Sequence, residues 1–109
     1  MATVRKNLAQ SNPSATTLTD VYTVPASTTT VITTITIANR SATATSFRMS
    51  HALAGAADDS KQYLFYDVPV GGNDTFQVTT AIQMATTDKL RVYATLATLS
   101  FNIHGEELS

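Results

Sequence analysis

The chain has 109 residues, with no cysteine, 14% charged residues and a formal net charge of −1. This length suffices for a single domain with one core that needs no disulfide or structural metal. The missing cysteines exclude disulfides, thiolate metal sites and cysteine nucleophiles, and the near-neutral charge gives no electrostatic basis for binding nucleic acid or an anionic membrane.

The first 14 residues are predicted to form an N-terminal arm or a short edge strand. They include Val4, Arg5 and Leu8 and end at a turn-forming Asn-Pro-Ser sequence. A frayed chain end is the alternative, because termini are ordered only where something holds them. If the segment is an arm, we expect Val4, Arg5 and Leu8 to make its contacts with a neighbouring subunit.

Residues 15–109 are predicted to form a single β-sandwich domain. The first predicted strands cover residues 18–24, 31–38 and 45–53, and Pro25 ends the first of them because it has no N–H to donate to a ladder. In the second strand Val31, Thr33, Ile35 and Ile37 share one face. The alanine-rich residues 54–60 are predicted to be a loop or a single helical turn, since isolated helices this short are unstable.

Residues 63–70 are apolar on both faces of the predicted strand. Tyr63 and Phe65 share one parity, and Leu64, Tyr66 and Val68 share the other. Such a strand is either central in a sandwich or covered on its outer face by a partner. Because Pro69 disfavours a central position, the pattern favours a partner.

The clearest two-residue periodicity lies between residues 74 and 103, where three consecutive strands are predicted. Large side chains such as Phe76, Val92 and Phe101 alternate with polar ones such as Gln77 and Asn102. Each run therefore has one face for a core and one for water, as in an antiparallel sheet. Residues 105–109 are predicted to be a polar tail.

Seven or eight short strands with turns between them predict an all-β fold, a two-sheet antiparallel sandwich of Greek-key type. The jelly-roll and immunoglobulin-like strand orders both remain open at this point. The water-facing positions are rich in threonine and poor in charge. Surfaces of that kind are cheap to desolvate, which favours packing against a neighbour.

No motif for catalysis or for cofactor binding is present in the sequence. It has neither a phosphate-binding glycine loop nor a Gly-x-Ser-x-Gly elbow, so no catalytic residue and no cofactor is predicted. His51 and His104 could meet as metal ligands, but we favour a half-buried, hydrogen-bonded His51 and predict no metal site. Asp58 and Asp59 lack the spaced oxygen ligands of a calcium loop.

No segment predicts contact with a membrane. No apolar run approaches the ~20 residues of a membrane span, and the first residues lack the apolar segment of a signal peptide. We therefore expect a protein made and assembled in a cytoplasm, without a membrane or nucleic-acid partner.

The remaining charged and aromatic residues predict an interaction surface. Asp67 and Asp74 flank the Gly-Gly turn and are expected to cap backbone amides rather than to act as an acid–base pair. The strand arginines are interpreted as solubilising charges or edge protection, with an ion pair between subunits as the alternative. Exposed tyrosines favour interfaces. The candidate subunit or capsid interface consists of Leu64, Tyr66, Val68, Tyr93, Arg48 and Arg91.

Segments spread over nearly the whole chain after residue 10 share a resemblance to one protein family. The most specific is Leu18–Ala26, and the others are residues 31–40, 43–48, 63–67, 73–76, 92–94 and 99–102. Together they resemble a family of small β-rich proteins encoded in the structural gene clusters of tailed bacteriophages and prophages. The resemblance implies a non-enzymatic virion protein, foremost a capsid decoration (cement) protein. It also implies a homo-oligomer, with a trimer favoured, that binds the major capsid protein or other virion proteins.

Two further functions are weighed against this one. The same gene clusters encode tail-fibre and baseplate proteins, so a host-recognition module is the alternative. Such a module would bind a surface glycan through loop residues 54–61, where Asp58 and Asp59 lie near tyrosines. A hydrolase comes last, because the sequence shows no nucleophile with its base.

Overall fold

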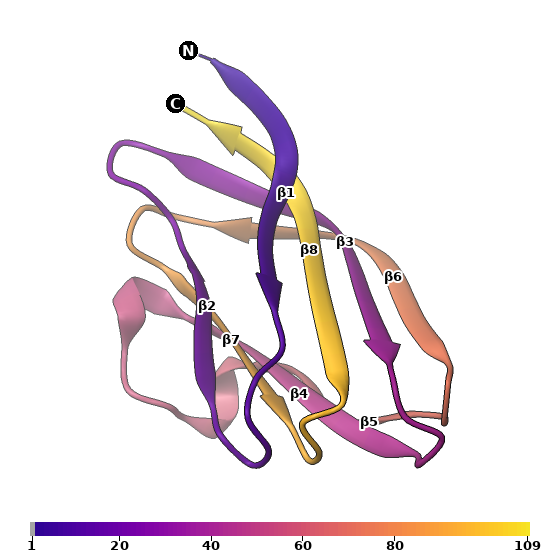
Figure 1. Cartoon of the computed structure of the whole chain (residues 1–109). Coiled ribbons are helices and arrows are strands. Elements are labelled where there is room, and N and C mark those ends of the chain that lie inside the picture. Colours follow the sequence, from indigo (N-terminus) through magenta and orange to yellow (C-terminus); the bar gives the residue numbers. More distant parts are fainter. Residues whose placement is uncertain (1) are drawn as a thin grey trace.

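Eight strands make up most of the chain in a computed structural model, which describes residues 2–109 (Figure 1). They form two antiparallel sheets of four, so the predicted two-sheet β-sandwich is confirmed. Sheet A has the strand order β1-β8-β3-β6, and sheet B has the order β2-β7-β4-β5. The strands are β1 Thr3–Ser11, β2 Thr19–Thr23, β3 Thr29–Asn39, β4 Thr45–Ala52, β5 Tyr63–Val70, β6 Thr75–Met84, β7 Lys89–Ala94 and β8 Leu99–Leu108.

The strand order decides between the two predicted topologies. β1 pairs with β8, β2 with β7, β3 with β6 and β4 with β5, so the first half of the chain pairs throughout with the second half. Eight strands nested in this way form a jelly roll, whereas an immunoglobulin sandwich has a different strand order. The nesting also brings the chain ends together: Ala2 and Ser109 exchange backbone hydrogen bonds of 2.6 and 2.9 Å (Figure 1).

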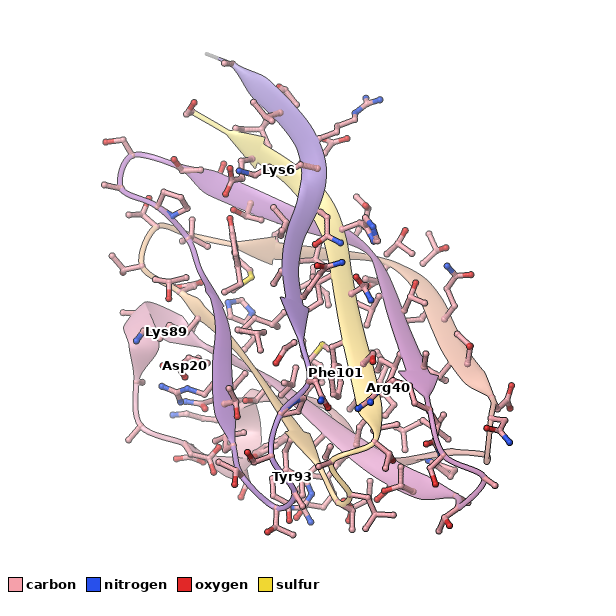
Figure 2. All side chains as sticks on the ribbon, in the orientation of Figure 1. Lys6, Asp20, Arg40, Lys89, Tyr93 and Phe101 are labelled. Carbon is pink, nitrogen blue, oxygen red and sulfur yellow. The ribbon has the colours of Figure 1, made fainter. Side chains whose placement is uncertain are left out.

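The core lies between the sheets and is centred on Phe47 of β4. Its ring lies 5.8 Å from Phe65, 5.4 Å from Phe76 and 5.9 Å from Phe101 between ring centroids. Two of these rings come from sheet A and two from sheet B, and Phe101 is labelled in Figure 2. All four phenylalanines of the chain therefore meet in one cluster that joins the sheets.

The alternation predicted between residues 74 and 103 is present, but β8 continues further than expected. Leu99, Phe101 and Ile103 are fully buried, and the strand runs on to Leu108. The predicted polar tail at residues 105–109 is thus wrong. The reason is that β8 lies between β1 and β3, so both of its edges are hydrogen-bonded along these residues.

The first residues of the chain also have more structure than a frayed end. Residues 3–11 are an edge strand of sheet A, which is one of the two forms predicted for them. Leu8 packs against the core, Arg5 forms an ion pair of 2.8 Å with Glu106, and Val4 remains exposed. These contacts lie within the chain, and a contact of this strand with another subunit stays a prediction.

A shift of register crosses sheet A and changes which side chains face the core. Ile32 lies opposite Gly105 but Thr34 lies opposite His104, so Thr33 is an extra residue in β3. This bulge reverses the parity of the strand. On the N-terminal side of the bulge, Ile32 is fully buried while Val31 is only partly buried. The predicted common face of Val31 with Ile35 and Ile37 is therefore wrong.

The segment between β4 and β5 has two short 3-10 turns, Leu53–Gly55 and Ser60–Gln62. The prediction for residues 54–60, a loop or a single helical turn, is close to this arrangement. The loop packs on sheet B beside β7: Arg91 donates to the carbonyls of Ala56 and Gly55 at 2.8 and 3.3 Å. It thereby covers part of the outer face of that sheet.

The close approach of strands at Gly105 leads to a stability prediction. A Cβ added there would lie 2.3 Å from the Val31 carbonyl oxygen, which is backbone and cannot move aside. We expect Gly105→Ala to lower the free energy of unfolding by about 1–3 kcal/mol through overpacking. Urea unfolding followed by circular dichroism measures this change.

The control is Gly71→Ala, where the nearest atom to an added Cβ is the Asp74 carboxylate at 3.5 Å. This variant should unfold at nearly the same urea concentration as the wild type. Equal losses in the two variants would contradict the close packing of β8 against β3.

Candidate functional site

Edge strand β5 has two bulges, which determine which of its apolar side chains face the core and which are exposed. Phe47 and Met49 are two residues apart on β4, but their partners Val68 and Phe65 are three apart on β5. The extra residue lies at Tyr66–Asp67, where Asp67 has a positive φ of 51°. A further register shift lies between Met49 and Ser50 of β4.

The bulge explains why the strand looked apolar on both faces. Phe65 and Val68 both pack against the core because the parity reverses between them. Leu64 and Tyr66 are exposed, at 43% and 59%. Val68 is therefore partly buried against the core and does not belong with the exposed residues, while its part in an interface stays a prediction. That a partner covers Leu64 and Tyr66 stays a prediction.

Arg48 of β4 lies between two tyrosine rings on the outer face of sheet B. Its guanidinium carbon is 4.2 Å from the ring centroid of Tyr66 and 4.6 Å from that of Tyr93. Tyr93 lies directly opposite Arg48 on β7, and Figure 2 shows it well away from Lys89 and Asp20. We call Arg48, Tyr66 and Tyr93 the Tyr66 surface; exposed Leu64 lies two residues before Tyr66 on β5.

Asp67 fixes the position of the Arg48 side chain. Its two carboxylate oxygens accept from Arg48 Nε at 2.7 Å and from Nη2 at 3.3 Å. The hydrogen bond to Asp67 raises the pKa of Arg48, so the guanidinium keeps its charge. The expectation that Asp67 caps a backbone amide is wrong, since the bulge places its carboxylate beside Arg48. Asp74 does cap an amide, accepting from Thr75 N at 2.8 Å.

An open pocket adjoins the Tyr66 surface. It is lined by Arg48, Asp58, Asp59, Ser60, Tyr63 and Tyr66. The Tyr63 and Tyr66 rings meet edge to face with centroids 5.2 Å apart. Burial, together with the nearby carboxylate of Asp58, raises the pKa of Tyr63. Loop residues 58–60 and the tyrosines of β5 thus lie together, as the glycan-binding alternative requires.

Arg91, the remaining candidate interface residue, is held inside the chain. Its side chain is only 11% exposed, and Nε donates to Asp20 at 2.8 Å. Lys89 also contacts Asp20, at 3.2 Å, and this pair is visible in Figure 2. The interpretation of Arg91 as a solubilising charge is wrong, because the loop of residues 53–62 covers it. Sequence reasoning missed this role because it could not place that loop on sheet B.

The two histidines lie on different sheets. His51 Nε2 is 2.8 Å from Asp88 Oδ2, and its side chain is 14% exposed, which confirms a satisfied, half-buried histidine. His104 is exposed on sheet A, where its ring lies 3.5 Å from Asn7 Nδ2. Within residues 2–109 there is no group of three or more His, Cys, Asp or Glu residues placed to hold a metal ion.

Asp88 joins three segments at one end of the sandwich. Besides His51, its carboxylate accepts from the backbone N–H groups of Ala54 at 2.9 Å and Ala85 at 3.0 Å. Burial acts to raise the pKa of Asp88, but these hydrogen bonds outweigh it and hold the pKa below its ordinary value of 3.8. The ionised carboxylate therefore stabilises the folded state.

Comparisons with known proteins give no relatives for this chain. No protein-family model, no curated protein and no solved structure matches it. In the described part of the chain, no helix has the length and apolar character needed to cross a membrane.

The contacts of Asp88 predict how stability depends on pH. Because its folded-state pKa is lowered, the carboxylate contributes stability that is present above the ordinary value of 3.8 and is lost as the pH falls further. Asp88→Ala should lower the free energy of unfolding at neutral pH by about 1–3 kcal/mol, since it leaves buried N–H groups unpaired. Denaturant unfolding between about pH 2.5 and 7 measures both effects.

Asp74→Ala is the matched control, because Asp74 caps one exposed amide. It should cost less than Asp88→Ala at neutral pH. The difference in the free energy of unfolding between wild type and Asp88→Ala should become smaller in acid. A gap that stays constant over the pH range would show that the Asp88 charge does not stabilise the fold.

Proposed function

We propose that this chain is a non-enzymatic structural protein of a bacteriophage virion, a capsid decoration protein that adheres to the shell through the Tyr66 surface. The observation that carries the proposal is the grouping of exposed Tyr66 with Arg48 and Tyr93 on the outer face of sheet B, with exposed Leu64 two residues before Tyr66 on the same edge strand. Tyrosine and arginine, together with tryptophan, are enriched among the residues that dominate binding energy at protein interfaces.

The surface is prepared for binding because its side chains are already fixed. The Arg48 side chain is held by Asp67 and by the two tyrosine rings, so little side-chain entropy remains to be lost on association. The carboxylate also balances the arginine charge within the chain. A partner therefore meets aromatic area, whose burial is favourable, and an arginine that already has its counter-ion.

The resemblance of the sequence segments to phage structural proteins supports the virion role. The jelly roll recurs among viral capsid domains, although a likeness of fold alone does not carry a function. A homo-oligomer bound to the major capsid protein belongs to the same proposal. Adhesion needs no catalytic residue, in keeping with a sequence in which no nucleophile and base can be paired.

The proposal predicts that Leu64→Asp and Tyr66→Asp each abolish binding to capsids that lack this protein. Both side chains are exposed, so a buried charge is not created and the variants should fold. Co-sedimentation with such capsids measures binding, and circular dichroism verifies the fold. We expect saturation of wild-type binding at a stoichiometry compatible with capsid symmetry.

Leu96→Asp is the matched control, because Leu96 is also an exposed leucine but lies in the turn between β7 and β8. It should bind like the wild type. Normal capsid binding by both Leu64→Asp and Tyr66→Asp would refute the assignment of this surface.

Host-cell recognition is the second candidate function, and the pocket beside the Tyr66 surface favours it. Its rim combines the tyrosine rings with the carboxylates of Asp58 and Asp59 and the hydroxyl of Ser60. Aromatic faces against sugar rings and carboxylates as acceptors for sugar hydroxyls are the groups that a glycan site needs. On this proposal the chain is a tail-fibre or baseplate domain.

The double variant Asp58→Ala/Asp59→Ala separates the two functions. It removes the acceptors of the pocket and leaves Leu64, Tyr66 and Tyr93 in place. If the chain recognises a glycan, this variant should lose binding to host cells or purified surface polysaccharide in a pull-down. If the chain decorates capsids, the variant should still co-sediment with them, and the wild type should not bind the cells.

A further inference from the structure

The four outer strands of the two sheets differ in how they resist pairing with another chain. β1 carries Arg5 and Lys6, the five-residue β2 carries Asp20, and β5 carries Asp67 and Pro69. All three also have a register irregularity. Charges, proline, short length and bulges are the devices that keep sheet edges from pairing.

β6 is the exception among these edges. Its ten residues, TFQVTTAIQM, include no charged residue, no proline and no glycine. Within residues 2–109 it pairs with β3 alone, and Figure 1 shows no element beyond it. Its one irregularity relative to β3 lies beyond Thr79, so residues 75–79 form a regular run with an open edge.

The hydrogen bonds at the start of β6 show which backbone groups face that open edge. Asn39 N donates to Asp74 O at 2.9 Å, so Asp74 is bonded toward β3. Bonded and non-bonded positions alternate in an antiparallel ladder. Thr75, Gln77 and Thr79 therefore direct their N–H and C=O groups outward. Thr75 N agrees with this assignment, because it donates to the Asp74 side chain at 2.8 Å.

The same five residues are nearly symmetric in sequence. In Thr-Phe-Gln-Val-Thr, an antiparallel pairing centred on Gln77 sets Thr75 opposite Thr79, Phe76 opposite Val78 and Gln77 opposite itself. Threonine pairs and aromatic–β-branched pairs are favourable across strands, and stacked glutamine amides hydrogen-bond to each other. No like charges face each other in this register.

We propose that β6 is a self-association edge, at which a second copy of this chain pairs antiparallel about a two-fold axis through Gln77. The two Gln77 residues exchange backbone hydrogen bonds, and Thr79 N–H donates to Thr75 of the partner copy. Sheet A then continues as one eight-stranded sheet. The occupant is a second copy, and not an arbitrary strand, because the register is complementary to itself.

The outer face of sheet A supports the same register. Gln10, Asn102, Thr36 and Gln77 form one row across its four strands. Within the row, Gln10 donates to Asn102 at 2.8 Å and Gln77 donates to Thr36 at 3.0 Å. Pairing at Gln77 extends this uncharged row into the second copy without a break.

The inference concerns the chain alone and does not rest on the proposed function. It differs from the trimer that the family resemblance implies, because a two-fold axis closes the contact at two copies. Sedimentation equilibrium over a concentration series tests it in the absence of capsids. We expect a monomer–dimer equilibrium for the wild type.

Gln77→Lys places two like charges opposite each other and should raise the dimer dissociation constant by roughly tenfold or more. Gln10→Lys is the matched control, because Gln10 lies in the same row on the opposite edge of the sheet. It should dimerise like the wild type. A monomer at all concentrations, a trimer, or a dimer indifferent to Gln77→Lys would each overturn the proposal.

Cross-linking gives a second readout, since the chain has no cysteine of its own. Residues paired across a two-fold lie about 5.5 Å apart between Cα atoms, within the range of a disulfide. Gln77→Cys should form a covalent dimer under mild oxidation, while Gln10→Cys should remain largely monomeric. Equal cross-linking of both variants would show that contact at β6 is not specific.

Discussion

The packing of Phe47 against rings from both sheets is the contact on which the rest of this structure depends. Phe65 comes from the same sheet, and Phe76 and Phe101 come from the opposite one. A small domain has little interior, so four aromatic side chains in one cluster supply a large share of its buried apolar area. The strands that contribute them are far apart in the chain, and their docking therefore fixes the nested strand order of the jelly roll.

Bulges adapt the strands to this core and also create the exposed surface. A strand of strict two-residue period would turn either Phe65 or Val68 outward, since they are three positions apart. The extra residue at Tyr66–Asp67 keeps both against the core, and Tyr66 is the side chain that remains outside. The same bulge brings Asp67 to Arg48. The Tyr66 surface thus arises from the bulge that lets edge strand β5 place both apolar side chains against the core.

Sequence reasoning predicted the sandwich because its strongest signal is the alternation in β6, β7 and β8, which the structure retains. It failed where a bulge breaks that alternation, as at Thr33 and Asp67, because a single extra residue leaves no mark in composition. The tyrosines and Arg48 could be selected by residue type, but their grouping could not. It depends on the register of β4 with β7 and on the loop of residues 53–62. The positions of Val68 and Arg91 were missed for the same reason.

Most of the few positively charged residues of this chain form ion pairs within it. Five of its seven lysines and arginines contact carboxylates of the same chain, namely Arg5, Lys6, Arg48, Lys89 and Arg91. Little net field is left to attract a partner from a distance. On the proposals made above, recognition rests on aromatic area at the Tyr66 surface and on backbone groups and amides at β6. Such contacts act only at close range, so shape and strand register, and not charge, select the partner.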